Sequence, residues 1–177
     1  MNRFTITNPA NCIGCHTCEA ACAVAHLDAA EASSFQQASF RPRLKVIFGR
    51  EITSTTQCRH CDNAPCVIAC PTKALTHVGD TVQFVGERCF GCKTCVIACH
   101  YGAINLVNHK VMKPVPGSIS AQSVQPIAFK CDLCVDRANG PACVEACPTQ
   151  AIRLTTSASA DEMLSATRER ATHNPAT

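Results

Sequence analysis

The apolar residues of this 177-residue chain fall into short runs separated by polar residues, Gly and Pro. Several runs alternate apolar and polar positions or concentrate Val, Ile and Leu, a pattern that predicts β-strands. The predicted strands cover residues 43–49, 74–78, 81–85, 103–107 and 151–155. Gly79 and Asp80 separate the second from the third and predict a tight hairpin.

Four five-residue segments rich in Ala and apolar residues predict one helical turn each. They are CEAAC at 18–22, CVIAC at 66–70 and again at 95–99, and CVEAC at 143–147. A single turn does not persist alone, because helix nucleation fixes several residues for one hydrogen bond. These turns must therefore be stabilised by packing.

Two polar stretches carry less pattern. Residues 113–126, KPVPGSISAQSVQP, predict a loop from their Pro, Gly and Ser content. Ser159 and Glu162 have the spacing of a capping box and predict a helix through residues 163–170. This helix belongs to a polar C-terminal tail, residues 156–177, which we expect either to fray or to bind a partner.

The apolar core is expected to be thin. Aromatic residues make up 5% of the chain, Trp is absent, and 10 Pro and 8 Gly interrupt the regular segments. Short helices and hairpins in mixed order predict an α+β fold, but one too poor in large apolar side chains to be stable through burial alone. Another interaction must stabilise this chain.

Sixteen cysteines supply the candidate, and they form four groups of four. The groups are Cys12, Cys15, Cys18 and Cys22; Cys58, Cys61, Cys66 and Cys70; Cys89, Cys92, Cys95 and Cys99; and Cys131, Cys134, Cys143 and Cys147. Groups one and three share the spacing C-x2-C-x2-C-x3-C, and all four groups end in C-x3-C. NAPCVIACPT in group two is echoed by NGPACVEACPT in group four, which indicates an internal duplication.

This spacing indicates iron–sulfur clusters. Three closely spaced cysteines let a short loop wrap one [4Fe–4S] cube, while the fourth binds a different cube. The groups must therefore act in pairs, and four groups predict four [4Fe–4S] clusters. Gly14 and Gly91 lie inside two wrapping loops and are candidates for positive φ. Pro71 and Pro148 follow the last cysteines of groups two and four, as in bacterial ferredoxins.

Disulfides and zinc explain the pattern less well. The N-terminus has no long apolar run after Arg3, so no secretory signal is predicted, and clustered cysteines in a reducing compartment hold metal more often than they pair. Zinc sites need two C-x2-C pairs, which leaves the C-x3-C intervals without a role. His16, His26 and His60 lie near cysteines, but the thiols already complete four clusters, so we expect no His ligand.

The phrases MNRF, CIGCHTCEAAC, CRHCDNAPC, ERCFGCKTC, KCDLC and GPACVEACPT resemble the four-cluster ferredoxin family of electron-transfer subunits of molybdenum and tungsten oxidoreductases. The resemblance covers residues 1–155 and is greatest to the small iron–sulfur subunits associated with formate dehydrogenase and formate hydrogenlyase. It implies a duplicated, bacterial-ferredoxin-like fold of two dicluster modules held by iron–sulfur clusters.

The spacing alone also allows group one to pair with group two, and group three with group four. The resemblance implies instead that group one pairs with group four, and group two with group three. The implied ligand sets are Cys12, Cys15, Cys18 and Cys147; Cys131, Cys134, Cys143 and Cys22; Cys58, Cys61, Cys66 and Cys99; and Cys89, Cys92, Cys95 and Cys70. Groups one and four would form one module, and residues 58–99 the other.

The function implied by the resemblance is electron transfer without catalytic residues of its own. The chain would carry electrons between a molybdopterin or tungstopterin formate dehydrogenase and a second redox partner such as a hydrogenase. Two alternatives are an accessory or maturation protein for those enzymes and a free soluble polyferredoxin.

Other functional classes find little support in the sequence. We find no nucleotide-binding glycine motif and no Ser-His-Asp pattern. The formal charge of +3 is scattered without a basic run, which argues against nucleic acid as a partner. No apolar stretch reaches membrane-spanning length, so we expect a cytoplasmic protein without direct membrane insertion.

Overall fold

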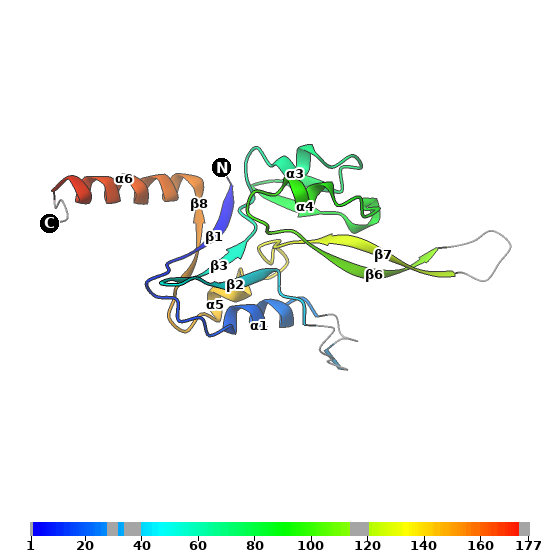
Figure 1. Cartoon of the computed structure of the whole chain (residues 1–177), viewed down its shortest axis with the longest axis horizontal. Helices are drawn as coiled ribbons and strands as arrows, with labels where there is room; N and C mark the ends of the chain where they lie inside the picture. Colours follow the sequence, from blue (N-terminus) through cyan, green and yellow to red (C-terminus); the bar gives the residue numbers. More distant parts are fainter. Residues whose placement is uncertain (1, 28–31, 34–39, 114–120, 174–177) are drawn as a thin grey trace.

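The computed structural model of the chain describes residues 2–27, 32–33, 40–113 and 121–173. Its regular elements are short and mixed in order, which confirms the predicted α+β fold (Figure 1). The strands are β1 Arg3–Thr7, β2 Leu44–Phe48, β3 Thr53–Gln57, β4 Leu75–Val78, β5 Thr81–Phe84, β6 Asn105–Lys113, β7 Ala121–Phe129 and β8 Ile152–Thr156. The helices are α1 Thr17–Val24, α3 Pro65–Ile68, the 3-10 turn η2 Gly86–Arg88, α4 Thr94–Ala98, α5 Ala142–Glu145 and α6 Ser157–His173.

In the part of the chain that the structure describes, the strands pair antiparallel as four two-stranded sheets: β1 with β8, β2 with β3, β4 with β5 and β6 with β7. The predicted hairpin is confirmed as β4–β5, with Gly79 at φ +58° in the turn. The β1–β8 pair has the greatest sequence separation, with Arg3 opposite Thr156. It joins the beginning of the described chain to its last strand.

Each predicted helical turn forms in its C-x3-C segment. Helix α3 begins with a proline, Pro65, whose fixed φ suits the first helical position. Helices α1 and α4 each follow a residue in the left-handed conformation, His16 at φ 60° and Lys93 at φ 68°. Gly14 and Gly91 also have positive φ, +69° and +79°, as their place in the loops predicts.

The short helices pack in two pairs, α1 against α5 and α3 against α4 (Figure 1). The first and last cysteine groups therefore lie close together in space. The two central groups, which lie between them in the sequence, form the second pair. Cysteines belong to the apolar clusters of both pairs. One cluster contains Cys18, Cys22, Leu44, Val46, Cys143 and Ile152. The other contains Ala64, Cys66, Leu75, Val82, Cys95, Ile104 and Ala128.

The predicted loop at 113–126 is wrong in its second half. Strand β6 continues to Lys113, and β7 begins at Ala121 and includes Pro126, which lies opposite Asn108. A two-stranded sheet has edges on both sides, so a proline can occupy a position whose missing N–H needs no partner. Residues 114–120 of the predicted loop lie outside the described residues.

The predicted tail helix forms as α6, but its predicted cap is wrong. The helix follows β8 directly at Ser157, and the Thr156 hydroxyl accepts the Ser159 backbone N–H at 3.2 Å. Ser159 therefore lies in the first turn instead of capping it, because Thr156 is both the last strand residue and the cap. Figure 1 shows α6 projecting away from the rest of the fold, and Met163 and Leu164 are exposed.

Across the described residues, no helix combines the length and apolarity needed to cross a membrane.

Gly91 gives a test of how closely the wrapping loop approaches the β7 backbone. A Cβ at Gly91 would clash with the carbonyl oxygen of Pro126, whereas a Cβ at Gly79 would meet nothing within 4 Å. We expect Gly79→Ala to cost about 1 kcal/mol of stability through its positive φ alone. Gly91→Ala should cost about 1–3 kcal/mol more through the backbone clash. Anaerobic denaturant unfolding of the cluster-loaded protein measures both, and equal losses would contradict the described contact.

Candidate metal centre

Two of the implied ligand sets each line one cavity. Cys12, Cys15 and Cys18, from the loop into α1, share a cavity with Cys147, from the turn after α5. Cys89, Cys92 and Cys95, from the loop into α4, share a second cavity with Cys70, from the turn after α3. In both cavities, three thiols come from one loop and the fourth comes from a distant group.

The other two sets lie deeper. Burial raises the pKa of the Cys66 thiol to about 11, and the neighbouring Cys58, Cys99 and Cys61 raise it further. Burial likewise raises the pKa of Cys143 to about 12, with added contributions from Cys22 and Cys134. The thiols with the largest electrostatic influence on Cys66 and on Cys143 are thus members of the same implied set, while Cys18 of another set has a smaller influence on Cys143.

The two packed halves meet at buried cysteines. Cys58 of group two and Cys131 of group four belong to one buried cluster with Ala103 and Leu133. By contrast, Cys15 and Cys92 are exposed at the two cavities described above. Of the four implied sets, the two that contain Cys15 and Cys92 are therefore called the outer sets, and the two that contain Cys58 and Cys131 the inner sets.

Backbone N–H groups point at the last cysteine of three groups. The donors are four residues further on: Ala74 to Cys70 Sγ at 3.2 Å, Ala103 to Cys99 Sγ at 3.4 Å and Ala151 to Cys147 Sγ at 3.2 Å. The residue before each alanine, Lys73, Gly102 or Gln150, has positive φ. This repeated turn aims a donor at the sulfur, as a thiolate metal ligand requires.

The two exposed cysteines each receive a hydroxyl instead. Thr17 donates to Cys15 Sγ at 3.3 Å, and Thr94 donates to Cys92 Sγ at 3.4 Å. The side-chain hydrogen bond is the largest influence on each thiol and lowers its pKa. Both threonines therefore favour the charged thiolate at the surface.

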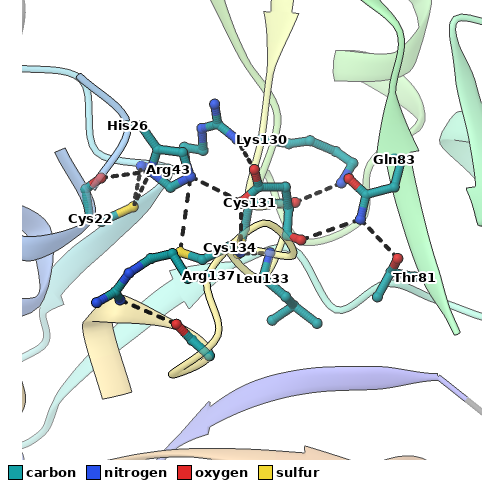
Figure 2. Close-up of polar contacts among 12 residues, drawn as sticks. Cys22, His26, Arg43, Thr81, Gln83, Lys130, Cys131, Leu133, Cys134 and Arg137 are labelled. Carbon is teal, nitrogen blue, oxygen red and sulfur yellow. Dashed lines mark hydrogen bonds and ion pairs between the residues drawn. The ribbon is translucent and has the colours of Figure 1, made fainter. Parts of the chain in front are cut away.

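At Cys22, the last cysteine of group one, the repeated turn does not form, because α1 continues past this residue to Val24. Its sulfur accepts the Arg43 backbone N–H at 3.3 Å and lies 3.9 Å from His26 Nδ1, which also contacts the Cys22 carbonyl oxygen at 2.7 Å (Figure 2). His26 Nε2 lies 3.1 Å from Asp132 Oδ1 and 4.0 Å from Cys134 Sγ, and Arg43 pairs with the other Asp132 oxygen.

This network keeps the His26 ring charged. Burial opposes protonation, but the hydrogen bond to Asp132 and the contacts with Cys134 and Cys22 outweigh it and raise the pKa of His26 to about 12. Burial opposes ionisation of Asp132 too, yet His26 and Arg43 hold its pKa well below its usual range. Although His26, Asp132 and Cys134 could together surround a metal ion, a doubly protonated ring has no lone pair to offer one.

The donor set fits [4Fe–4S] clusters. Buried thiols such as Cys18, whose pKa burial raises to about 11, are poor thiolates unless a metal ion balances their charge. A [4Fe–4S] cluster takes four thiolate ligands, one on each iron, and the clustered sulfurs with N–H and O–H donors supply them. Bound clusters would supply reversible one-electron storage, while the protein supplies the ligands and the hydrogen bonds around them.

These features define an iron–sulfur electron carrier of α+β, ferredoxin-like fold. The chain belongs to the 4Fe-4S dicluster domain family, whose model matches residues 51–157, and a 4Fe-4S binding domain model matches residues 9–25.

Named relatives agree with this class. Electron transport protein HydN of Escherichia coli (strain K12) is 44% identical over 152 residues, which cover 86% of this chain and 87% of HydN. Formate hydrogenlyase subunit 2 of the same organism is 36% identical over 174 residues, which cover 87% of this chain and 82% of that subunit. AegA, which carries the name of an oxidoreductase, is 43% identical over 96% of this chain, but the chain spans only 24% of AegA.

Sequence reasoning missed the side chains that surround the sulfurs. Thr17 and Thr94 stand two residues after Cys15 and Cys92 in the repeated phrases, so the repeat carried a signal for them. The Arg43–Asp132–His26 network had no such signal, because Asp132 lies 106 residues from His26 and 89 residues from Arg43.

The threonine hydroxyls can be tested by substitution. Thr17→Val should lower the reduction potential of the cluster bound by Cys15, because the lost hydrogen bond stabilised charge that increases on reduction. Thr17→Ser keeps the hydroxyl and should retain the potential. Redox titration followed by electron paramagnetic resonance measures this shift, and equal potentials in the Val and Ser variants would refute the role of the hydroxyl.

Proposed function

We propose that this electron carrier holds four [4Fe–4S] clusters in two modules within residues 1–155. The ligand sets are Cys12, Cys15, Cys18 and Cys147; Cys131, Cys134, Cys143 and Cys22; Cys58, Cys61, Cys66 and Cys99; and Cys89, Cys92, Cys95 and Cys70. Support comes from the cavities that two of these sets line and from the mutual influence of the buried thiols in the other two.

The proposed function rests on which cysteines are exposed and which are buried. Cys15 and Cys92 are exposed in different cavities, and Cys58 and Cys131 are buried where the two halves meet. An electron could thus enter at one exposed set, pass the two buried sets and leave at the other. A carrier with two accessible ends serves two partners.

Apolar surface accompanies both ends. Phe48 is 61% exposed, and its ring lies so close over Gly14 that a Cβ there would be 2.5 Å from it. Ile13 next to Gly14 is also exposed, and Phe90 lines the second cavity with 57% of its surface exposed. Exposed apolar residues beside a redox centre are typical of a docking surface for another protein.

The partners we propose are a molybdopterin or tungstopterin formate dehydrogenase at one end and a hydrogenase or another iron–sulfur subunit at the other, in the cytoplasm. The names of two relatives, an electron transport protein and a formate hydrogenlyase subunit, support this choice. The match to about a quarter of AegA supports the same role, since a similar unit lies within a larger protein named as an oxidoreductase.

The ligand sets can be tested by paired substitutions. Cys12→Ala and Cys147→Ala should remove the same cluster, so the double variant should lose about as much iron as either single variant, about four atoms. Cys12→Ala with Cys22→Ala should affect two clusters and lose about eight. Iron analysis of anaerobically purified protein measures both. Additive loss in the first pair would contradict these ligand sets and favour pairing of groups one and two, in which Cys12 and Cys147 would bind different clusters.

The partners can be tested by anaerobic affinity purification from the native host, with mass spectrometry and an iron and zinc count on the same sample. We expect about sixteen iron atoms per chain and a stoichiometric formate dehydrogenase. Full iron without a stable partner would favour the free carrier or the maturation role. Zinc in place of iron would refute the iron–sulfur assignment.

A further inference from the structure

Lys130 is a buried cation at the boundary between the two packed halves. It immediately precedes Cys131, and the residue is 4% exposed. Its Nζ donates to the carbonyl oxygen of Val82 at 2.5 Å. It also donates to the carbonyl oxygen of Cys131 at 2.6 Å (Figure 2). Val82 lies in β5, within the half that contains groups two and three, whereas Cys131 belongs to group four.

The part of the chain that the structure describes supplies no counter-ion for the charge of Lys130. Both of its acceptors are neutral carbonyl groups, and among the described residues no carboxylate pairs with its ammonium within 4.0 Å. Asp132 lies two residues away, but its carboxylate pairs with His26 and Arg43. A buried ammonium costs several kcal/mol unless an anion compensates it, so an anion is expected nearby.

The surroundings of Lys130 indicate which anion this is. The residue adjoins Cys131, and its charge also acts on Cys66, where it opposes the rise in pKa caused by burial and by Cys58 and Cys99. Cys131 and Cys66 belong to the two inner ligand sets. A [4Fe–4S] cube with four thiolates carries a net negative charge, which reduction by one electron increases.

We propose that Lys130 is the shared counter-ion of the two inner clusters and stabilises their reduced states. This inference rests on the proposed ligand sets. The hydrogen bonds to Val82 and Cys131 fix the ammonium in place, and Gln83 Nε2, which donates to the Asp132 carbonyl oxygen at 3.3 Å, joins the same two segments. A fixed cation raises the reduction potential of the clusters beside it and leaves the distant outer clusters unchanged.

The test compares Lys130→Met, which removes the charge at similar length, with Lys130→Arg, which keeps it. Lys45→Met removes an exposed lysine on β2 and is the matched control. Redox titration of the cluster-loaded proteins, followed by electron paramagnetic resonance, reports the potential of each cluster. The paired cysteine substitutions described above must first establish the ligand sets, which separates failure of this inference from failure of those sets.

We expect Lys130→Met to lower the equilibrium constant for reduction of two clusters by about tenfold, which corresponds to about 59 mV for one electron. The other two clusters, and all four in Lys45→Met and Lys130→Arg, should keep their potentials. Unchanged inner potentials in a loaded Lys130→Met protein would overturn the proposal, as would an equal shift of all four.

Iron retention provides a second measurement if Lys130→Met does not load. In that case Lys130→Arg should retain iron while Lys130→Gln loses it, because assembly of the inner clusters would require the charge. Loss of iron from the Arg and Gln variants alike would indicate that the shape of the lysine matters and would overturn the counter-ion role. Retention by Lys130→Gln with unchanged potentials would overturn it as well.

Discussion

The fold depends on the charge of buried sulfur. Cysteines occupy positions in both apolar clusters where larger proteins place Leu, Ile or Phe, and burial raises the pKa of thiols such as Cys66 and Cys143. Neutral thiols contribute little apolar area, and thiolates without a metal ion would repel one another. Iron resolves both problems at once, since it binds the thiolates and connects segments that have few other contacts. We therefore expect metal binding and folding to be coupled in this chain.

Along the sequence, the half of the chain that contains groups two and three is inserted between groups one and four. Groups two and three, with the β4–β5 hairpin between them, are close in sequence, so their contacts require short loops. Groups one and four meet through the packing of α1 on α5 and the pairing of β1 with β8. Closing that long loop costs more entropy than closing the inner one. In the sequence, groups one and four thus flank groups two and three, and Lys130 lies at the boundary where the backbones of the two halves are joined.

Much of this architecture can be predicted from the sequence, and the gaps have physical causes. Short apolar runs identified β2, β4, β5, β6 and β8, whereas β1 and β3 were missed; β3, TSTTQ, has no apolar residue and forms through its β-branched threonines. The loop prediction failed at β7 because a two-stranded sheet tolerates Pro126. The cysteine spacing identified every thiol, but the network of His26, Arg43 and Asp132 depends on tertiary contacts that spacing does not encode.

The distribution of charge explains why a chain with a formal charge of +3 can serve as an electron carrier. Four oxidised clusters would shift that charge to about −5, and each electron adds to it. The most buried sulfurs have the greatest need for cations, and it is there that Lys130 and the His26–Asp132–Arg43 network lie. The exposed cysteines instead receive neutral donors, Thr17 and Thr94. Interior cations thus compensate for the solvation that burial removes, so that buried and exposed sites can both accept electrons.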